Sequence, residues 1–359
     1  MSGDPVPADG ESAGDDGRSV RERVGEVEVT RRNALAAVGG GAALGGGKAV
    51  DNVLLGYGVL VGENLKTQDL AAVAGERPDA TLRDSALPDG HRAAVGDDSL
   101  SVVDSGGETV ATVSLPGDPD DGAAVDADLG FESGAVEQLV RDLSDLRAGD
   151  YEFAFSTLDP YFDRVDAADA RPFTTGALRG PHYDDADPET VAAFADADPA
   201  RPRTLLDGLV AAFREYSSYD VPRYLAGSVE DNLLFGAVDL RQHFETPADF
   251  DAVREDDGTG MFCWEFANRS LEALHAVPAH RQRHPVVGMK VHDERHKHTF
   301  TGVASAVREG GNDGSLVIPA TFVDYTHSTL YDDFRLTSVL GEGFEAYNER
   351  HRATEIYWA

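Results

Sequence analysis

The pattern of hydrophobic and polar positions predicts both strands and helices in the first half of the chain. Residues 99–115 alternate between apolar and polar on both sides of a Ser-Gly-Gly turn, which predicts a β-hairpin. Residues 135–146 repeat their apolar positions with the helical period, which predicts an amphipathic helix. The run 151–158 is typical of a strand. We therefore expect an accessory region of mixed α/β structure over residues 66–165.

From about residue 204 the pattern becomes sharper. An amphipathic helix is predicted first, and a second helix begins near the single cysteine. Three apolar strands then follow, at residues 285–291, 298–307 and 315–325. Helices followed by a run of strands favour an α+β fold, with a helix packed on an antiparallel sheet.

The N-terminal segments differ from the rest of the chain. Residues 1–29 are polar and acidic, which predicts a disordered leader. Residues 30–64 contain Arg31 and Arg32 before apolar, glycine-rich runs, and they resemble a twin-arginine export signal or an apolar anchor. We expect a secreted or cell-surface protein. Attachment to a membrane through residues 34–62 is one way in which it could be held at the surface. The alternative is a disordered arm on a cytoplasmic protein, and no run of 18 apolar residues predicts a transmembrane helix.

Acidic residues dominate the charge of the chain. Lys and Arg number 31 against 65 Asp and Glu, so the formal net charge is −34. Nucleic-acid binding is not expected, because phosphate contacts need a basic surface. The composition resembles that of extreme halophiles of the archaeal type, in which molar salt screens such repulsion with a Debye length of about 3 Å.

The chain has one cysteine, Cys263, so it can form neither an intramolecular disulfide nor a cysteine metal cluster. Cys263 opens a predicted helix, and a helix N-terminus favours the thiolate form of a cysteine. Ala267, Ser270, Leu271 and Leu274 share its helical face, so the thiol is expected to point toward the packed side. A catalytic thiolate also needs a base and a group that orients the base.

The downstream sequence supplies both groups. His298 opens a predicted strand 298 − 263 = 35 positions after Cys263, and Asp324 ends the next strand 324 − 298 = 26 positions later. Two antiparallel strands packed on a helix N-terminus can bring the three side chains together.

Two other histidines, His292 and His296, are alternative candidates for the base. The run from His292 to His298 also suggests a metal site, but it lacks the H-E-x-x-H pattern because Asp293 occupies the place of the glutamate. A hairpin here would also break the helix that such a site needs. We therefore expect no metal and no other cofactor.

The order of these motifs resembles the transglutaminase-like branch of the papain-like fold. The segment "TPADFDAVREDDGTGMFCWEFANRSLEAL" is similar to the cysteine motif of that family, "HTF" to its histidine strand and "VDYT" to its aspartate motif. The resemblance covers residues 204–335 within an expected domain over 166–359. It implies Cys263 as nucleophile, His298 as general base and acid, and Asp324 as the residue that orients His298.

The implied chemistry is acyl transfer on peptide or isopeptide amides of a protein or peptide substrate, through a thioester of Cys263. Hydrolysis is favoured because water is the abundant acceptor, and transfer to an amine is the alternative. The N–H of Cys263 is the natural half of an oxyanion hole, and Gln242 is a candidate side-chain donor. A competing hypothesis is a binding or surface-assembly protein that keeps the fold without activity.

Overall fold

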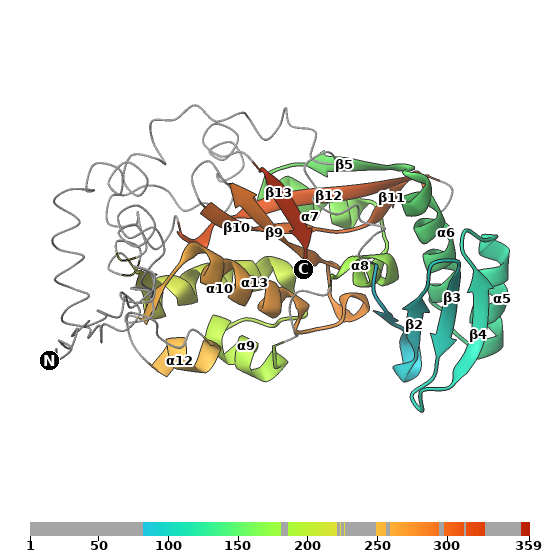
Figure 1. Ribbon diagram of the computed structural model, residues 1–359, viewed down its shortest axis with the longest axis horizontal. Helices are drawn as coiled ribbons and strands as arrows, with labels where there is room; N and C mark the ends of the chain where they lie inside the picture. Colours follow the sequence, from blue (N-terminus) through green and yellow to red (C-terminus); the bar gives the residue numbers. More distant parts are fainter. Residues whose placement is uncertain are drawn as a thin grey trace, which may run out of the picture. The chain divides into compact units, whose positions relative to one another are not determined.

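The computed structural model describes residues 82–180, 186–220, 223, 226, 249–255, 259–293, 298–311, 314–326 and 353–359 (Figure 1). All of these except residues 223 and 226 belong to one compact unit, made of Val50–Val221 and Thr246–Ala359. The predicted leader over 1–29 and the predicted signal over 30–64 lie outside the described residues.

The described residues form a mixed α/β protein with eight α-helices and mainly antiparallel sheets, which confirms the α+β expectation at this level. The helices are α5 (Pro119–Leu129), α6 (Ala135–Ala148), α7 (Leu158–Ala167), α8 (Pro172–Leu178), α9 (Pro188–Ala195), α10 (Pro202–Tyr216), α12 (Phe250–Glu255) and α13 (Cys263–His275). The strands are β1 (Ser85–Ala86), β2 (Arg92–Val95), β3 (Ser99–Val103), β4 (Thr109–Ser114), β5 (Tyr151–Phe155), β6 (Asp169–Ala170), β7 (Ser217–Tyr219), β8 (Thr259–Met261), β9 (Val287–Asp293), β10 (His298–Ala304), β11 (Val307–Glu309), β12 (Ser315–Val323) and β13 (Glu355–Trp358).

A seven-stranded sheet forms the centre of the unit (Figure 1). β10 lies between β9 and β12 and is antiparallel to both, and β13 extends the sheet beyond β9. β11 continues the run of β10 and forms a hairpin with β12, as the apolar pattern predicts. The antiparallel pairing of β10 with β12 places the beginning of one strand beside the end of the other.

One strand of this sheet comes from much earlier in the chain. β5 pairs with β12 in parallel, in a register that runs from Leu316 opposite Tyr151 to Ala320 opposite Phe155. β5 lies within the predicted accessory region, on the other side of the predicted boundary at residue 165. The large sheet therefore draws strands from both predicted regions.

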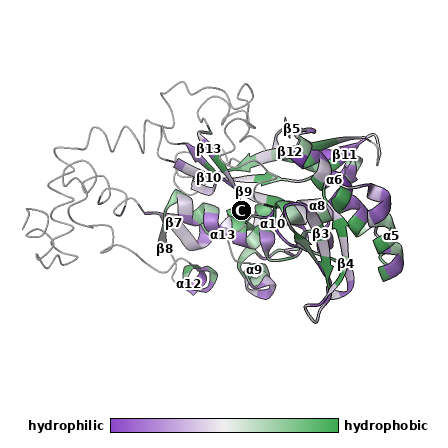
Figure 2. Ribbon diagram, turned by 45° about the vertical axis from the view of Figure 1, so that its right-hand side comes forward, coloured by the Kyte–Doolittle hydropathy of each residue, from purple (hydrophilic) through white to green (hydrophobic). Residues whose placement is uncertain are grey.

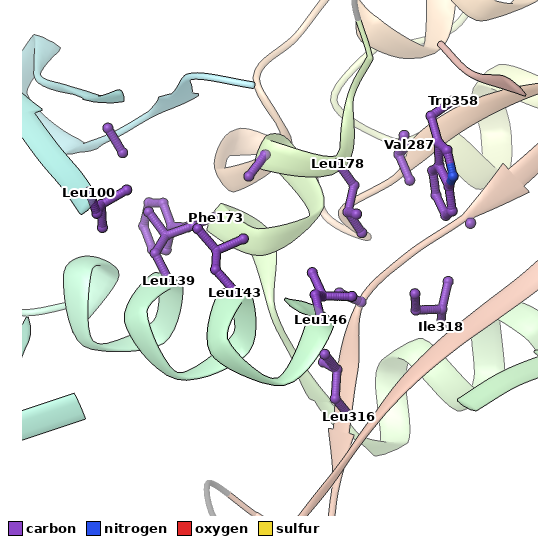
Figure 3. Packing of buried hydrophobic residues seen from close by; sticks show 14 of the residues in the cluster. Leu100, Leu139, Leu143, Leu146, Phe173, Leu178, Val287, Leu316, Ile318 and Trp358 are labelled. Atoms are coloured by element: carbon purple, nitrogen blue, oxygen red, sulfur yellow. The ribbon is translucent and has the colours of Figure 1, made fainter. Parts of the chain in front are cut away.

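A smaller antiparallel sheet contains β1 to β4 in sequence order. Its β3–β4 hairpin is the one predicted over 99–115. α6 packs between the two sheets, and Figure 3 shows Leu139, Leu143 and Leu146 pointing from this helix into a core that includes Leu100 and Ile318. The two sheets therefore share one hydrophobic core across α6.

A second hydrophobic core lies under the helices α7, α9, α10, α12 and α13. α13 packs against β9, β10 and α10. Its buried residues include Phe266, Leu271 and Leu274. Hydrophobic and hydrophilic segments alternate along this helix (Figure 2), as expected for a helix with one buried face. The predicted packed face of the cysteine helix is thus the buried face.

Candidate active site

Cys263 is the first residue of α13, as the sequence predicts. The helix begins after Phe262, whose backbone is extended. The N–H of Phe262 donates a 2.7 Å hydrogen bond to Oε2 of Glu265 in the first turn. The first N–H groups of a helix have no acceptor within the helix and attract negative charge. Cys263 is half-buried, and the neighbouring Trp264 is 41% exposed. The thiol therefore lies at an electropositive and accessible helix terminus.

Gly288 of β9 allows α13 to lie close to the large sheet. A Cβ atom at this position would lie 2.4 Å from Cδ2 of Leu271 and 3.3 Å from Nε2 of His275. Without that Cβ, the backbone N–H of Gly288 donates a 2.8 Å hydrogen bond to Nε2 of His275. Burial and the nearby charge of Arg179 lower the pKa of His275 well below its ordinary value, so the ring is a neutral acceptor.

Arg179, just after α8, binds the other end of the cysteine helix. Its guanidinium donates hydrogen bonds to the carbonyl oxygens of His275 at 3.3 Å and of Val277 at 2.9 Å. The last carbonyls of a helix lack partners within the helix, and a cation there also interacts favourably with the helix dipole. α13 is therefore fixed at both ends and along its face toward β9.

His298 and Asp324 form a buried pair beside the helix N-terminus. Nε2 of His298 donates a 3.0 Å hydrogen bond to Oδ2 of Asp324, and the two residues are 3% and 2% exposed. The backbone N–H of Thr326 donates to the second oxygen, Oδ1, at 3.1 Å. Both carboxylate oxygens are thus bound, which fixes the orientation of the carboxylate toward the imidazole.

The side chain of Cys263 also interacts with the imidazole of His298. Since Nε2 faces Asp324, the remaining ring nitrogen, Nδ1, is the one available to the sulfur. Burial has the largest single effect and lowers the pKa of His298, but the charge and hydrogen bond of the Asp324 carboxylate and the contact with Cys263 together outweigh it. The net result is a pKa of about 10, so the ring is an imidazolium at neutral pH.

The structure therefore brings Cys263, His298 and Asp324 together. His292 lies on β9, where its ring packs edge-on against Tyr357 with the centroids 5.4 Å apart. His296, the other alternative base, and Gln242, the candidate oxyanion donor, lie outside the described residues. Of the two histidines in the described part of this run, His298 is the one bound to both the thiol and the carboxylate.

Sequence patterns did not assign a role to two further residues beside the site. Tyr325 directly follows Asp324, is buried, and hydrogen-bonds to Ser270 of α13 at 2.8 Å. Asp293 ends β9 fully buried, opposite His298 in the strand register. A buried carboxyl or phenol group needs polar partners. Those partners meet it only in the folded chain, so local sequence patterns do not reveal them.

Two cavities lie elsewhere in the unit. One of about 610 Å³ is lined by residues of α6, β5 and β12, together with Arg308, and one of about 170 Å³ lies near His275 and His280. Within the described ranges, no group of three or more His, Cys, Asp or Glu side chains could hold a metal ion. Among the helices that the structure describes, none has the length and apolar character to span a membrane.

The candidate site is defined by its geometry: a buried imidazolium between a thiol and a carboxylate at a helix N-terminus. No protein-family model matches the chain, and no match is found among the curated proteins or the solved structures.

Proposed function

We propose that the protein is a cysteine-dependent acyl-transfer enzyme that acts on peptide or isopeptide amides. One observation carries this proposal: the imidazole of His298 interacts with the side chain of Cys263 and is hydrogen-bonded to Asp324. A thiol beside an imidazole that is itself oriented by a carboxylate is the arrangement that activates a cysteine nucleophile.

The arrangement of elements supports a papain-like core of the transglutaminase type. The cysteine is the first residue of α13, which packs against an antiparallel part of the sheet. His298 is the first residue of β10, and Asp324 directly follows the neighbouring strand β12. This is the order and placement that the resemblance in the sequence implies.

The chemistry then proceeds in two steps. The Cys263 thiolate attacks the amide carbonyl carbon, the C–N bond breaks, and the proton carried by His298 moves to the leaving nitrogen. A water molecule next attacks the thioester carbonyl and gives a proton to His298. The C–S bond breaks, a carboxylic acid leaves, and the thiolate–imidazolium pair is restored. Asp324 stabilises the imidazolium in each cycle.

Hydrolysis is the favoured outcome. Cys263 is half-buried and lies beside the exposed Trp264, so a thioester formed there is open to solvent. Transfer to an amine requires a pocket that excludes water while the acyl-enzyme waits. The substrate is then a protein or peptide that can reach a helix terminus at the surface.

Alkylation of the single cysteine by iodoacetamide tests this proposal, because no other residue of the chain has a thiol. In molar KCl, the folded wild-type protein should be alkylated faster than the unfolded chain at the same pH, since an imidazolium and a helix N-terminus beside the sulfur favour its attack. His298→Ala should slow this alkylation. Asp324→Asn should give a smaller change in the same direction. His292→Ala is the matched control and should behave like the wild-type protein.

The chemical step needs a separate measurement. Casein incubated with the protein and hydroxylamine should yield new peptide termini if water is the acceptor, or protein hydroxamates if an amine accepts the acyl group. Cys263→Ala should abolish either product. A Cys263 that is alkylated only after unfolding would contradict the enzyme proposal and would favour a binding or surface-assembly role for the same fold.

A further inference from the structure

We propose that Ser270 and Tyr325 are positioning residues that set the placement of the His298–Asp324 pair relative to Cys263. The inference rests on the proposed function, and it concerns residues to which the resemblance assigns no role. Its basis is one buried hydrogen bond that joins the cysteine helix to the end of the aspartate strand.

The two hydroxyl groups meet inside the protein. Oγ of Ser270 lies 2.8 Å from the phenolic oxygen of Tyr325, and both residues are almost fully buried. Burial raises the pKa of Tyr325, so the phenol stays protonated and the bond joins two neutral hydroxyls. An unpaired hydroxyl at such depth is costly, which favours keeping this bond in the folded protein.

The bond connects the two elements that carry the proposed catalytic groups. Ser270 is 270 − 263 = 7 positions after Cys263 on α13, which places the two residues on the same helical face two turns apart. Tyr325 is bonded through the backbone to Asp324, whose carboxylate binds His298. The contacts thus form a closed ring that runs through Cys263, α13, Ser270, Tyr325, Asp324 and His298.

Aromatic packing holds the phenol ring in place. Tyr325 packs edge-on against Phe213 of α10, with the centroids 5.1 Å apart. Phe213 packs in the same way against Phe266 of α13, at 5.2 Å. The ring of Tyr325 therefore packs on Phe213 of α10, and its hydroxyl reaches Ser270 of α13. A phenylalanine would keep this packing and lose only the hydroxyl.

The backbone that follows Asp324 explains why the bond affects the imidazole. The N–H of Thr326 holds Oδ1 of Asp324, while Oδ2 holds His298. Residue 325 lies between these two anchors, so movement of Tyr325 shifts the carboxylate. A shifted carboxylate would carry the His298 ring away from the sulfur and weaken the thiolate–imidazolium pair.

The test compares Tyr325→Phe, Ser270→Ala and the double variant by iodoacetamide alkylation of Cys263 across pH in molar KCl. Each single variant should slow alkylation near about pH 6 by up to about tenfold, the effect of one net hydrogen bond. The double variant should be no slower than the singles, because all three lose the same bond. Tyr161→Phe is the matched control, since Tyr161 is a fully buried tyrosine of α7.

The outcomes separate this inference from the proposed function. If the folded wild-type thiol reacts faster than the unfolded chain and both single variants keep the wild-type profile, the positioning role is wrong and the enzyme proposal stands. If the folded wild-type thiol does not react, both fall. Far-UV circular dichroism establishes folding, and Ser270→Ala introduces the residue with the best helix propensity, so this variant is expected to stay folded.

Discussion

At the scale of single residues, His298 links the candidate site to the stability of the protein. Its pKa of about 10 lies above the ordinary value of about 6.5 that it regains on unfolding. The folded protein therefore binds a proton that the unfolded chain releases between these two values. This residue contributes stability that is complete below about pH 6.5 and is lost as the pH rises toward about 10.

We predict that the free energy of unfolding falls between about pH 7 and pH 10 in the wild-type protein and changes much less in His298→Gln. Urea unfolding in molar KCl at several pH values measures this slope. His275→Gln is the matched control, because the pKa of His275 is lowered by burial. The pH dependence of its contribution to stability has the opposite sign, because that contribution is lost as the pH falls below about 6.5. A His298→Gln slope equal to that of the wild-type protein would contradict the assignment of the imidazolium.

The residues of the site differ in how far sequence could predict them. Cys263, His298 and Asp324 each lie at the boundary of a helix or strand, and such boundaries follow from local periodicity and from the family resemblance. The bond between Ser270 and Tyr325 spans 325 − 270 = 55 positions and depends on how α13 is placed relative to the segment that follows β12. Local patterns give no information about that contact.

At the scale of elements, a buried ionic network joins α6 to the large sheet. Asp142 of α6 is fully buried and accepts hydrogen bonds from Arg171 at 2.9 Å and from Arg308 of β11 at 2.8 Å. Thr174 of α8 donates to the same carboxylate. Three elements thus meet at one acid. It is the buried carboxylate shared by two guanidinium groups, of which Arg171 also pairs with Asp169 and Arg308 with Asp145.

We predict that Asp142→Ala lowers the free energy of unfolding by up to about 3–5 kcal/mol, because it removes the buried carboxylate that Arg171 and Arg308 share and leaves each with one more exposed carboxylate, Asp169 or Asp145. Asp142→Asn should cost less, since the amide keeps an acceptor. Asp159→Ala is the control: its pair with Arg203 is exposed, and such pairs contribute at most about 1 kcal/mol. Urea unfolding compares the three variants, and equal losses for Asp142→Ala and Asp159→Ala would show that the buried network contributes no more than an exposed ion pair.

The elements themselves were largely predictable. The hairpin of β3 and β4, the helices α6 and α13, and the strands β9, β10 and β12 all follow from hydrophobic periodicity. The place of β5 in the large sheet did not follow, because a parallel neighbour of β12 can come from any earlier part of the chain. Periodicity identifies a strand but does not identify its partner.

At the scale of the whole molecule, charge sets the conditions for folding. A net charge of −34 on 359 residues opposes the compact state unless salt screens it. We predict that the far-UV circular dichroism signal and the urea midpoint fall markedly between molar KCl and about 0.1 M KCl, where the Debye length is about 10 Å. Equal stability in both salts would contradict the halophilic interpretation of the composition.

The parallel pairing of β5 with β12 has a consequence for the time course of synthesis. Tyr151 and its register partner Leu316 are separated by 316 − 151 = 165 residues. A ribosome that adds about 5–20 residues per second needs roughly 10–30 s to make the partner after β5 has emerged. During that interval the apolar strand β5 waits with unpaired backbone groups, a state that invites association with other chains. Nascent chains of this protein are therefore most vulnerable to aggregation, and most in need of a chaperone, before residue 323 leaves the ribosome.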